Sequence, residues 1–160
     1  MIYLNDTVDN KLLALKEQTG ALLWSNSPSS SGDLTVANGA IYITIQSACN
    51  LEALSATTGT TLWQYNTMDW SSSCIEGTPA VANGVVFVGS SDNYDPDCYC
   101  SAVFMLSAAN GTALNEIEED FGDSTNGNDP IVVANGTLYY SATGNVYAYR
   151  LPGTVSKKSA

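Results

Sequence analysis

Four cysteines are the residues of this 160-residue sequence whose chemistry is easiest to assign: Cys49, Cys74, Cys98 and Cys100. An even number of cysteines in a chain rich in Ser, Thr and Asn is typical of disulfide bonds in an exported protein. A Cys98–Cys100 bond would close a very small, strained ring, so Cys74 is expected to bond Cys49 or one of the Cys98/Cys100 pair. Zinc is the alternative, but a single Cys-x-Cys lacks the usual paired Cys-x-x-Cys spacing.

Carboxylates that could offer oxygen ligands to calcium are grouped at Asp92, Asp95 and Asp97. The group does not match an EF-hand loop, because the central Gly and the terminal Glu are absent. The simpler interpretation is a solvated turn. The acidic run from Glu116 to Asp123 is interpreted in the same way, as a solvated loop.

Histidine is absent from the sequence. The chain therefore has no imidazole to serve as a general base, as a metal ligand or as the partner of a nucleophilic serine. Paired carboxylates occur in a chain this acidic without indicating catalysis. No catalytic residue is predicted, and a binding role is favoured over an enzymatic one.

A repeated four-residue phrase predicts the strands that carry these residues. Val-Ala-Asn-Gly occurs at Val36–Gly39, Val81–Gly84 and Val133–Gly136, each time followed by an apolar run that contains an aromatic residue. Asn-Gly is the strongest short hairpin signal, because both residues tolerate positive φ. Each copy therefore predicts a strand, a tight turn and a second strand.

A second phrase repeats in phase with the first. Ala14–Trp24 is echoed by Ala53–Trp63 and more weakly by Met105–Asn115, and these segments predict two further strands around a Gly turn. Copies lie about 40 to 50 residues apart, the period of four-stranded propeller blades. The fold class predicted is all-β, a β-propeller of about four blades of four antiparallel strands over residues 1–151, with 152–160 as a flexible tail.

The strands of each blade, A to D, follow from these phrases. The first blade lacks strand A and the last lacks strand D, so the chain is expected to form part of a seven- or eight-bladed ring. The expected strands are Ile2–Asn5, Leu12–Lys16 and Ala21–Ser25 in the first blade; Leu34–Ala37, Ile41–Ile45, Leu51–Ser55 and Thr61–Tyr65 in the second; Pro79–Ala82, Val85–Gly89, Ala102–Ser107 and Ala113–Ile117 in the third; and Ile131–Ala134, Leu138–Ser141 and Val146–Leu151 in the fourth.

The phrase Ala-x-x-x-x-Thr-Gly-x-x-x-Trp resembles the docking repeat of pyrroloquinoline-quinone-like (PQQ-like) β-propellers, a family that includes quinoprotein alcohol dehydrogenases and a noncatalytic propeller of outer-membrane protein assembly. The resemblance covers Ile2 to Leu151 and implies that Trp24 and Trp63 wedge between adjacent blades. The sequence departs from the family pattern where Lys16 and Ser55 replace an Asp and where Asn115 replaces the Trp.

The topology of such blades separates short turns from long loops. The A–B and C–D turns share one end, and the longer connections share the other: Asn26–Asp33, Asn66–Thr78, Ser90–Ser101 and Glu118–Asp129. Because long loops on a rigid scaffold usually carry binding sites, we expect a noncatalytic scaffold that binds a protein or ligand through this end.

The alternative function is part of a PQQ-dependent dehydrogenase. The resemblance then implies a PQQ cofactor under a disulfide of adjacent cysteines, a Trp stacked on the cofactor, and calcium. Tyr99 separates Cys98 from Cys100, and Trp70, in a crossover loop, is the one tryptophan left to stack on a ligand.

Charge limits the partners. The net charge is −11, and the body of the chain carries only Lys11, Lys16 and Arg150 as basic residues, which excludes nucleic acid. No apolar stretch is long enough to span a bilayer, and no signal peptide is present in the sequence, although the cysteines favour an exported protein. The expected partners are a protein, further blades or a second copy that completes the ring.

Overall fold

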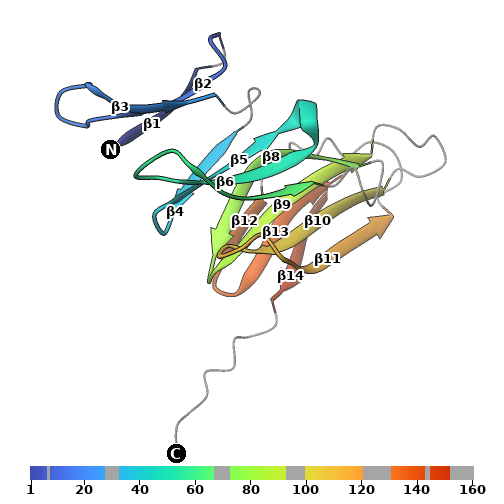
Figure 1. The fold of residues 1–160 in the computed structure, drawn as a ribbon. Coiled ribbons are helices and arrows are strands. Elements are labelled where there is room, and N and C mark those ends of the chain that lie inside the picture. The colour runs from blue at the N-terminus through green and yellow to red at the C-terminus, as the bar shows by residue number, and fades with distance from the viewer. Residues whose placement is uncertain are drawn as a thin grey trace, which may run out of the picture.

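The computed structural model describes residues 1–6, 8–27, 33–66, 73–92, 100–120, 131–142 and 145–151, with the backbone alone at a few positions that include Asp92 and Cys100. These residues form four antiparallel sheets that follow one another along the chain, as the repeat predicts. Each sheet is built from strands consecutive in sequence, so each is one propeller blade (Figure 1).

The first two blades agree closely with the expected strands. The first has the order β1 (Ile2–Asp6), β2 (Lys11–Leu15) and β3 (Leu22–Asn26). The second has the order β4 (Leu34–Ala37), β5 (Ala40–Ile45), β6 (Asn50–Ser55) and β7 (Thr61–Asn66), with the short 3-10 helix η1 (Gln46–Ala48) between β5 and β6. Within the described residues, the first blade contains no counterpart of β4.

The third blade is larger than predicted. Its strands are β8 (Ser73–Ala82), β9 (Val85–Asp92), β10 (Cys100–Ser107) and β11 (Ala113–Asp120). The expected loops before β8 and after β9 were therefore too long, because β8 begins six residues before Pro79 and β9 continues to Asp92. A register shift between Glu76 and Ala80 lets the long β8 include Pro79, since a bulge spares proline a ladder hydrogen bond.

The fourth blade contains β12 (Ile131–Ala134), β13 (Thr137–Ala142) and β14 (Asn145–Arg150) in that order. All three strands match their predicted positions to within one residue.

The Asn-Gly turns have the predicted geometry. Asn38 and Gly39 have φ values of 52° and 78°, and the other two copies are nearly identical. Positive φ at both central residues gives the turn a twist that matches the right-handed twist of its strands.

Three blades share one irregularity that the repeat did not reveal. The register between the third and fourth strands shifts at Ala14/Leu15, at Ala53/Leu54 and at Met105/Leu106. The extra residue in each fourth strand is a leucine, and all three leucines are exposed: Leu23, Leu62 and Leu114. A bulge adds local twist and redirects the following side chain, which in the first two blades is the repeat tryptophan.

The hydrophobic core lies between the blades. One cluster of buried residues joins the second blade to the third and includes Tyr42, Trp63 and Phe104, and another joins the third to the fourth through Phe87, Ile117 and similar side chains. A smaller cluster joins the first blade to the second. No helix in the described part of the chain is long and apolar enough to cross a membrane.

Candidate functional site

The long connections leave the blades at a single end, which we call the loop end. In the second blade this end carries η1 and Cys49, between β5 and β6. The strands β3 and β7 end at this same end, and β4 and β8 begin there. Among the described residues, the opposite end carries the Asn-Gly turns, the turns between the third and fourth strands, the start of β1 and the end of β14.

A disulfide bond braces the loop end. It joins Cys49, in the turn before β6, to Cys74 near the start of β8, with the two Cα atoms 4.5 Å apart. Cys49 is one of the partners predicted for Cys74. Its φ of 50° places it in the left-handed region, which few residues other than glycine adopt. The bond therefore fixes a hairpin of the second blade to β8, an edge strand of the third.

Hydroxyl groups reinforce this brace. Thr44 is fully buried, and its Oγ1 donates a hydrogen bond of 3.0 Å to the carbonyl oxygen of Gly77. Thr78 donates to Asp33 at 2.6 Å, and the Asp33 carbonyl accepts a bond from the Thr44 N–H. These bonds join the entry to the second blade with the entry to the third, so the described part of the loop end is held by several elements.

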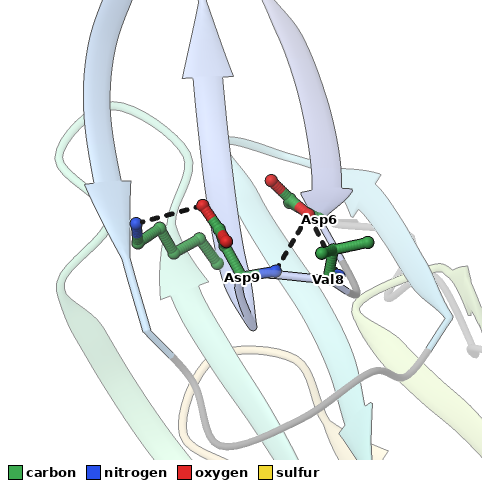
Figure 2. Close-up of polar contacts among 4 residues, drawn as sticks. Asp6, Val8 and Asp9 are labelled. Carbon is green, nitrogen blue, oxygen red and sulfur yellow. Dashed lines mark hydrogen bonds and ion pairs between the residues drawn. The ribbon is translucent and has the colours of Figure 1, made fainter.

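The first blade has a polar hairpin at the same end (Figure 2). The Asp6 carboxylate accepts hydrogen bonds from the backbone N–H groups of Val8 and Asp9, at 3.0 and 3.1 Å. Such a bond from an Asp side chain closes the turn locally. Lys11 lies 3.5 Å from Asp9, and both side chains are largely exposed, so this ion pair contributes little.

The two described tryptophans, Trp24 and Trp63, lie between blades, toward the opposite end. Trp24, from β3, donates its indole N–H to the carbonyl of Ala56 at 3.2 Å, and Tyr3 donates its hydroxyl to the same carbonyl at 3.0 Å. Ala56 in turn donates its own N–H to the carbonyl of Gly39. An indole from the first blade thus lies on the turn Ala56–Gly59 of the second blade. We call such a turn an indole seat.

The next pair of blades repeats this arrangement. Trp63 donates to the carbonyl of Ala108 at 3.1 Å, and Tyr42 donates to the same carbonyl at 3.4 Å. Ala108 donates to Gly84, as Ala56 does to Gly39. Burial raises the pKa of Tyr42, because the ionised phenolate would lose its hydration there.

Glycine forms the floor of each indole seat. A Cβ atom added at Gly59 would lie 2.6 Å from Cε3 of Trp24, and one at Gly111 would lie 2.5 Å from Cε3 of Trp63. The sequence pattern predicted these glycines only as turn residues. Their second role, to let the indole of the preceding blade lie on the backbone, was missed, although the recurrence of Thr-Gly or Asn-Gly in phase with Trp signals it.

Several predicted site residues cannot be placed. Cys98, Asp95, Asp97 and Trp70 lie outside the described residues, and for Asp92 and Cys100 only the strand is described, at the end of β9 and the start of β10. Calcium binding by Asp92, Asp95 and Asp97 and disulfide bonding by Cys98 and Cys100 therefore stay predictions.

In the described part of the chain, the disulfide and both indoles connect neighbouring blades. Among the described residues, no three His, Cys, Asp or Glu side chains gather in a way that could hold a metal ion. The disulfide that the structure shows joins cysteines from two blades, and both described indoles occupy seats on turns. What the described arrangement offers is a rigid, braced surface.

Comparisons with known proteins agree with this fold. The family model described as outer membrane protein assembly factor BamB matches residues 2–157. A protein of that name from Francisella salina is 34% identical over 59 residues, which are 37% of this chain and 11% of the relative. Among solved structures, BamB from Moraxella catarrhalis superposes with a TM-score of 0.64 at 18% identity, over 89% of this chain and 40% of that one.

Quinoprotein enzymes share the same fold. The quinohemoprotein alcohol dehydrogenase ADHIIG from Pseudomonas putida HK5 superposes with a TM-score of 0.66 at 19% identity, over 82% of this chain and 25% of the enzyme. The chain thus spans well under half of these relatives. Since the family model covers almost the whole sequence, the chain belongs to the PQQ-like β-propeller family described as outer membrane protein assembly factor BamB.

Proposed function

We propose that this chain is a noncatalytic scaffold of an exported β-propeller and that its loop end binds a protein partner. The partner we propose belongs to the machinery that assembles outer membrane proteins, as the name of the family implies. The observation that carries the proposal is the Cys49–Cys74 brace, which holds a hairpin of one blade against the next at the end where the long connections leave.

A braced loop end suits binding better than catalysis. Protein recognition requires a surface that is ordered before the partner arrives, because ordering it on binding costs affinity. The hydrogen bonds donated by Thr44 and Thr78 supplement the disulfide, so the strand ends that carry the loops are held in place. The chain has no histidine, and its described residues gather no metal-binding group.

Charge indicates the chemistry of the partner surface. The chain carries a net charge of −11, and Asp6, Asp9 and Asp33 lie at the loop end among the described residues. Complementary charge raises association rates and suppresses wrong partners. The partner is therefore expected to present a basic surface, and binding is expected to weaken as ionic strength rises.

Site-specific cross-linking tests the proposal. A photo-reactive amino acid at Ser27 or Ser47, both exposed at the loop end, is expected to join the chain to a purified assembly complex that lacks its own BamB. The matched control is Thr57, which is exposed at the opposite end of the second blade. Cross-links from Thr57 alone, or from none of the three positions, would refute the proposed surface.

The alternative, part of a PQQ-dependent dehydrogenase, is supported by the fold likeness to quinohemoprotein alcohol dehydrogenases. Its test is direct: PQQ and calcium are added to the oxidised chain, and the bound chromophore is measured by absorbance after gel filtration. Stoichiometric binding that requires calcium would favour the enzyme and contradict the noncatalytic proposal.

A further inference from the structure

The face of the second blade that meets the first blade carries a group of polar side chains. Asn50 and Glu52 in β6 lie directly opposite Asn66 and Gln64 in β7. Alternate residues of a strand share a face, as do residues directly opposite each other, so the four side chains lie on the face of Ile43. Ile43 belongs to the core cluster that joins the first blade to the second. We call the four polar residues the Glu52 array.

The positions that correspond to Glu52 at the other interfaces are apolar. By register, Glu52 corresponds to Phe104 in the third blade, which packs on Tyr65 of the second blade with ring centroids 5.9 Å apart. At the interface between the third and fourth blades, the same two positions are taken by Ile117 and Tyr147, which belong to one apolar cluster. A carboxylate at this position is therefore not a requirement of the repeat.

The Glu52 carboxylate is buried without a counter-charge. Glu52 is only 5% exposed, and its Oε1 accepts a hydrogen bond from the hydroxyl of Thr61. Among the residues that the structure describes, no Lys or Arg forms an ion pair with this carboxylate. A carboxylate taken out of water is costly unless it is paired with a cation and well hydrogen-bonded. Glu52 therefore lacks the partner that normally accompanies a buried acid.

A second acceptor on the same face lacks a donor. The side-chain oxygen of Asn50 is buried and accepts no hydrogen bond from the described residues. Asn50 lies two residues before Glu52 in β6, so their Cα atoms are about 7 Å apart. A buried acceptor without a donor costs free energy, and such groups are rare in folded proteins. Two neighbouring acceptors thus indicate a ligand that carries several N–H donors and a positive charge.

The first blade covers the Glu52 array only in part. Asn26 of the first blade corresponds by register to Tyr65, and its side chain donates a hydrogen bond of 2.7 Å to the carbonyl of Gly59. The first interface therefore has a short amide where the second has an aromatic ring. Gln64 and Asn66 are exposed, so solvent reaches the array on its β7 side.

We propose that the Glu52 array binds the guanidinium group of an arginine from a protein partner. A guanidinium is planar, carries five N–H donors and is less strongly hydrated than an ammonium, so it can pair with a buried carboxylate and an amide oxygen together. Calcium fits less well, because it requires six to eight oxygen ligands and no three acidic side chains gather among the described residues. The protein origin of the arginine rests on the proposed function, whereas binding of the guanidinium does not.

The probe for this site is ethylguanidinium, compared with ethylammonium and with neutral ethylurea on the full chain. Binding is followed by NMR, through ¹³C-labelled Glu carboxyl groups and the side-chain amide of Asn50. Saturable shifts at Glu52 and Asn50 are expected with ethylguanidinium, and Glu52→Gln should weaken its binding at least about tenfold, because a hydrogen bond to a charged group is lost. The control Glu17→Gln removes an exposed carboxylate at the opposite end and should leave binding unchanged.

A second variant covers failure of Glu52→Gln to fold. Asn50→Leu removes the other acceptor and is expected to weaken ethylguanidinium binding several-fold, while cooperative thermal unfolding shows that this variant is folded. Shifts that do not saturate, equal binding of ethylguanidinium and ethylurea, tighter binding of ethylammonium, or a response of Glu52 to calcium chloride alone would overturn the proposed site.

The cross-linking experiment separates this site from the proposed function. Loss of the Ser47 cross-link in Glu52→Gln would support an arginine supplied by the partner. If ethylguanidinium binds at Glu52 but neither Ser27 nor Ser47 forms a cross-link, the proposed function fails and the guanidinium site stands. Cross-links at Ser27 or Ser47 without ethylguanidinium binding would overturn the site and leave the proposed function intact.

Discussion

The first interface between blades and the second interface are built from the same parts but differ in completeness. Each has an indole on a glycine and a tyrosine hydroxyl on the same carbonyl. Trp63 is only 8% exposed, whereas Trp24 is half-buried. Beyond the tryptophan, the second blade places Tyr65 against Phe104 with ring centroids 5.9 Å apart, and the first blade places Asn26 at the same register.

The repeat motif therefore positions an indole without determining how deeply the indole is buried. Burial depends on the neighbouring side chains, and the second interface has the Tyr65–Phe104 pair where the first has Asn26. The disulfide adds a covalent link across the second interface. We therefore expect the second and third blades to form the stable centre of the molecule.

The largest expected effect separates the two tryptophans. Trp63→Ala is expected to lower the free energy of unfolding by about 3–5 kcal/mol, the usual cost of a large cavity in a core. Trp24→Ala should cost about 1–3 kcal/mol, because the indole is partly solvated. Urea denaturation followed by circular dichroism measures both, with the exposed Leu62→Ala as control. Equal losses at the two tryptophans would break the comparison.

Removing the Cys49–Cys74 disulfide should reduce the difference in stability between the two interfaces. Cys49→Ala with Cys74→Ala is expected to lower the free energy of unfolding by about 2–4 kcal/mol, since the bond closes a loop of moderate length in the unfolded chain. Chemical denaturation of this variant and of the natural chain, without reductant, measures the change. If reductant lowers the melting temperature of the variant as much as that of the natural chain, another disulfide accounts for the effect.

Two glycines, of which only one lies under an indole, test the role of glycine in the indole seats. Gly111→Ala is expected to cost about 1–3 kcal/mol more than Gly84→Ala, because both residues have positive φ but only Gly111 lies under an indole. Thermal unfolding of the two variants gives the difference. The difference should disappear in a Trp63→Ala background, and its persistence there would mean that the indole is not the cause.

The smallest expected effect is a pH dependence of the second interface. Burial, and secondarily the charge of Glu116, raise the pKa of Tyr65 above 10.0. A raised pKa means that the neutral phenol stabilises the fold below about pH 10 and that this contribution is lost as pH rises through the higher folded value. Ultraviolet absorbance titration of the natural chain and of Tyr65→Phe isolates this group.

The charge of Glu116 provides the control for this titration. Glu116→Gln should move the pKa of Tyr65 only part of the way back, because burial is the larger cause. A Tyr65 that titrates at its ordinary value in the natural chain would show that the phenol is more solvated than its packing against Phe104 indicates.

The repeat in the sequence determined most of the fold. Asn-Gly followed by an apolar run has few alternatives to a hairpin, so the strands of the second and fourth blades were predicted to within one residue. The third blade was predicted less well, because its strands extend into polar segments such as Gly89–Asp92, where strand pairing and not residue type decides the end of the strand.

Tertiary structure alone decided which residues meet across blades. The sequence left two kinds of partner open for Cys74, and the choice of Cys49 follows from the packing of a hairpin of the second blade on β8. The sequence also could not show that Gly59 and Gly111 are packing surfaces while Gly20 is open, because all three follow the same local pattern. A turn's conformation is encoded by its own residues, but what lies on it depends on the neighbouring blade.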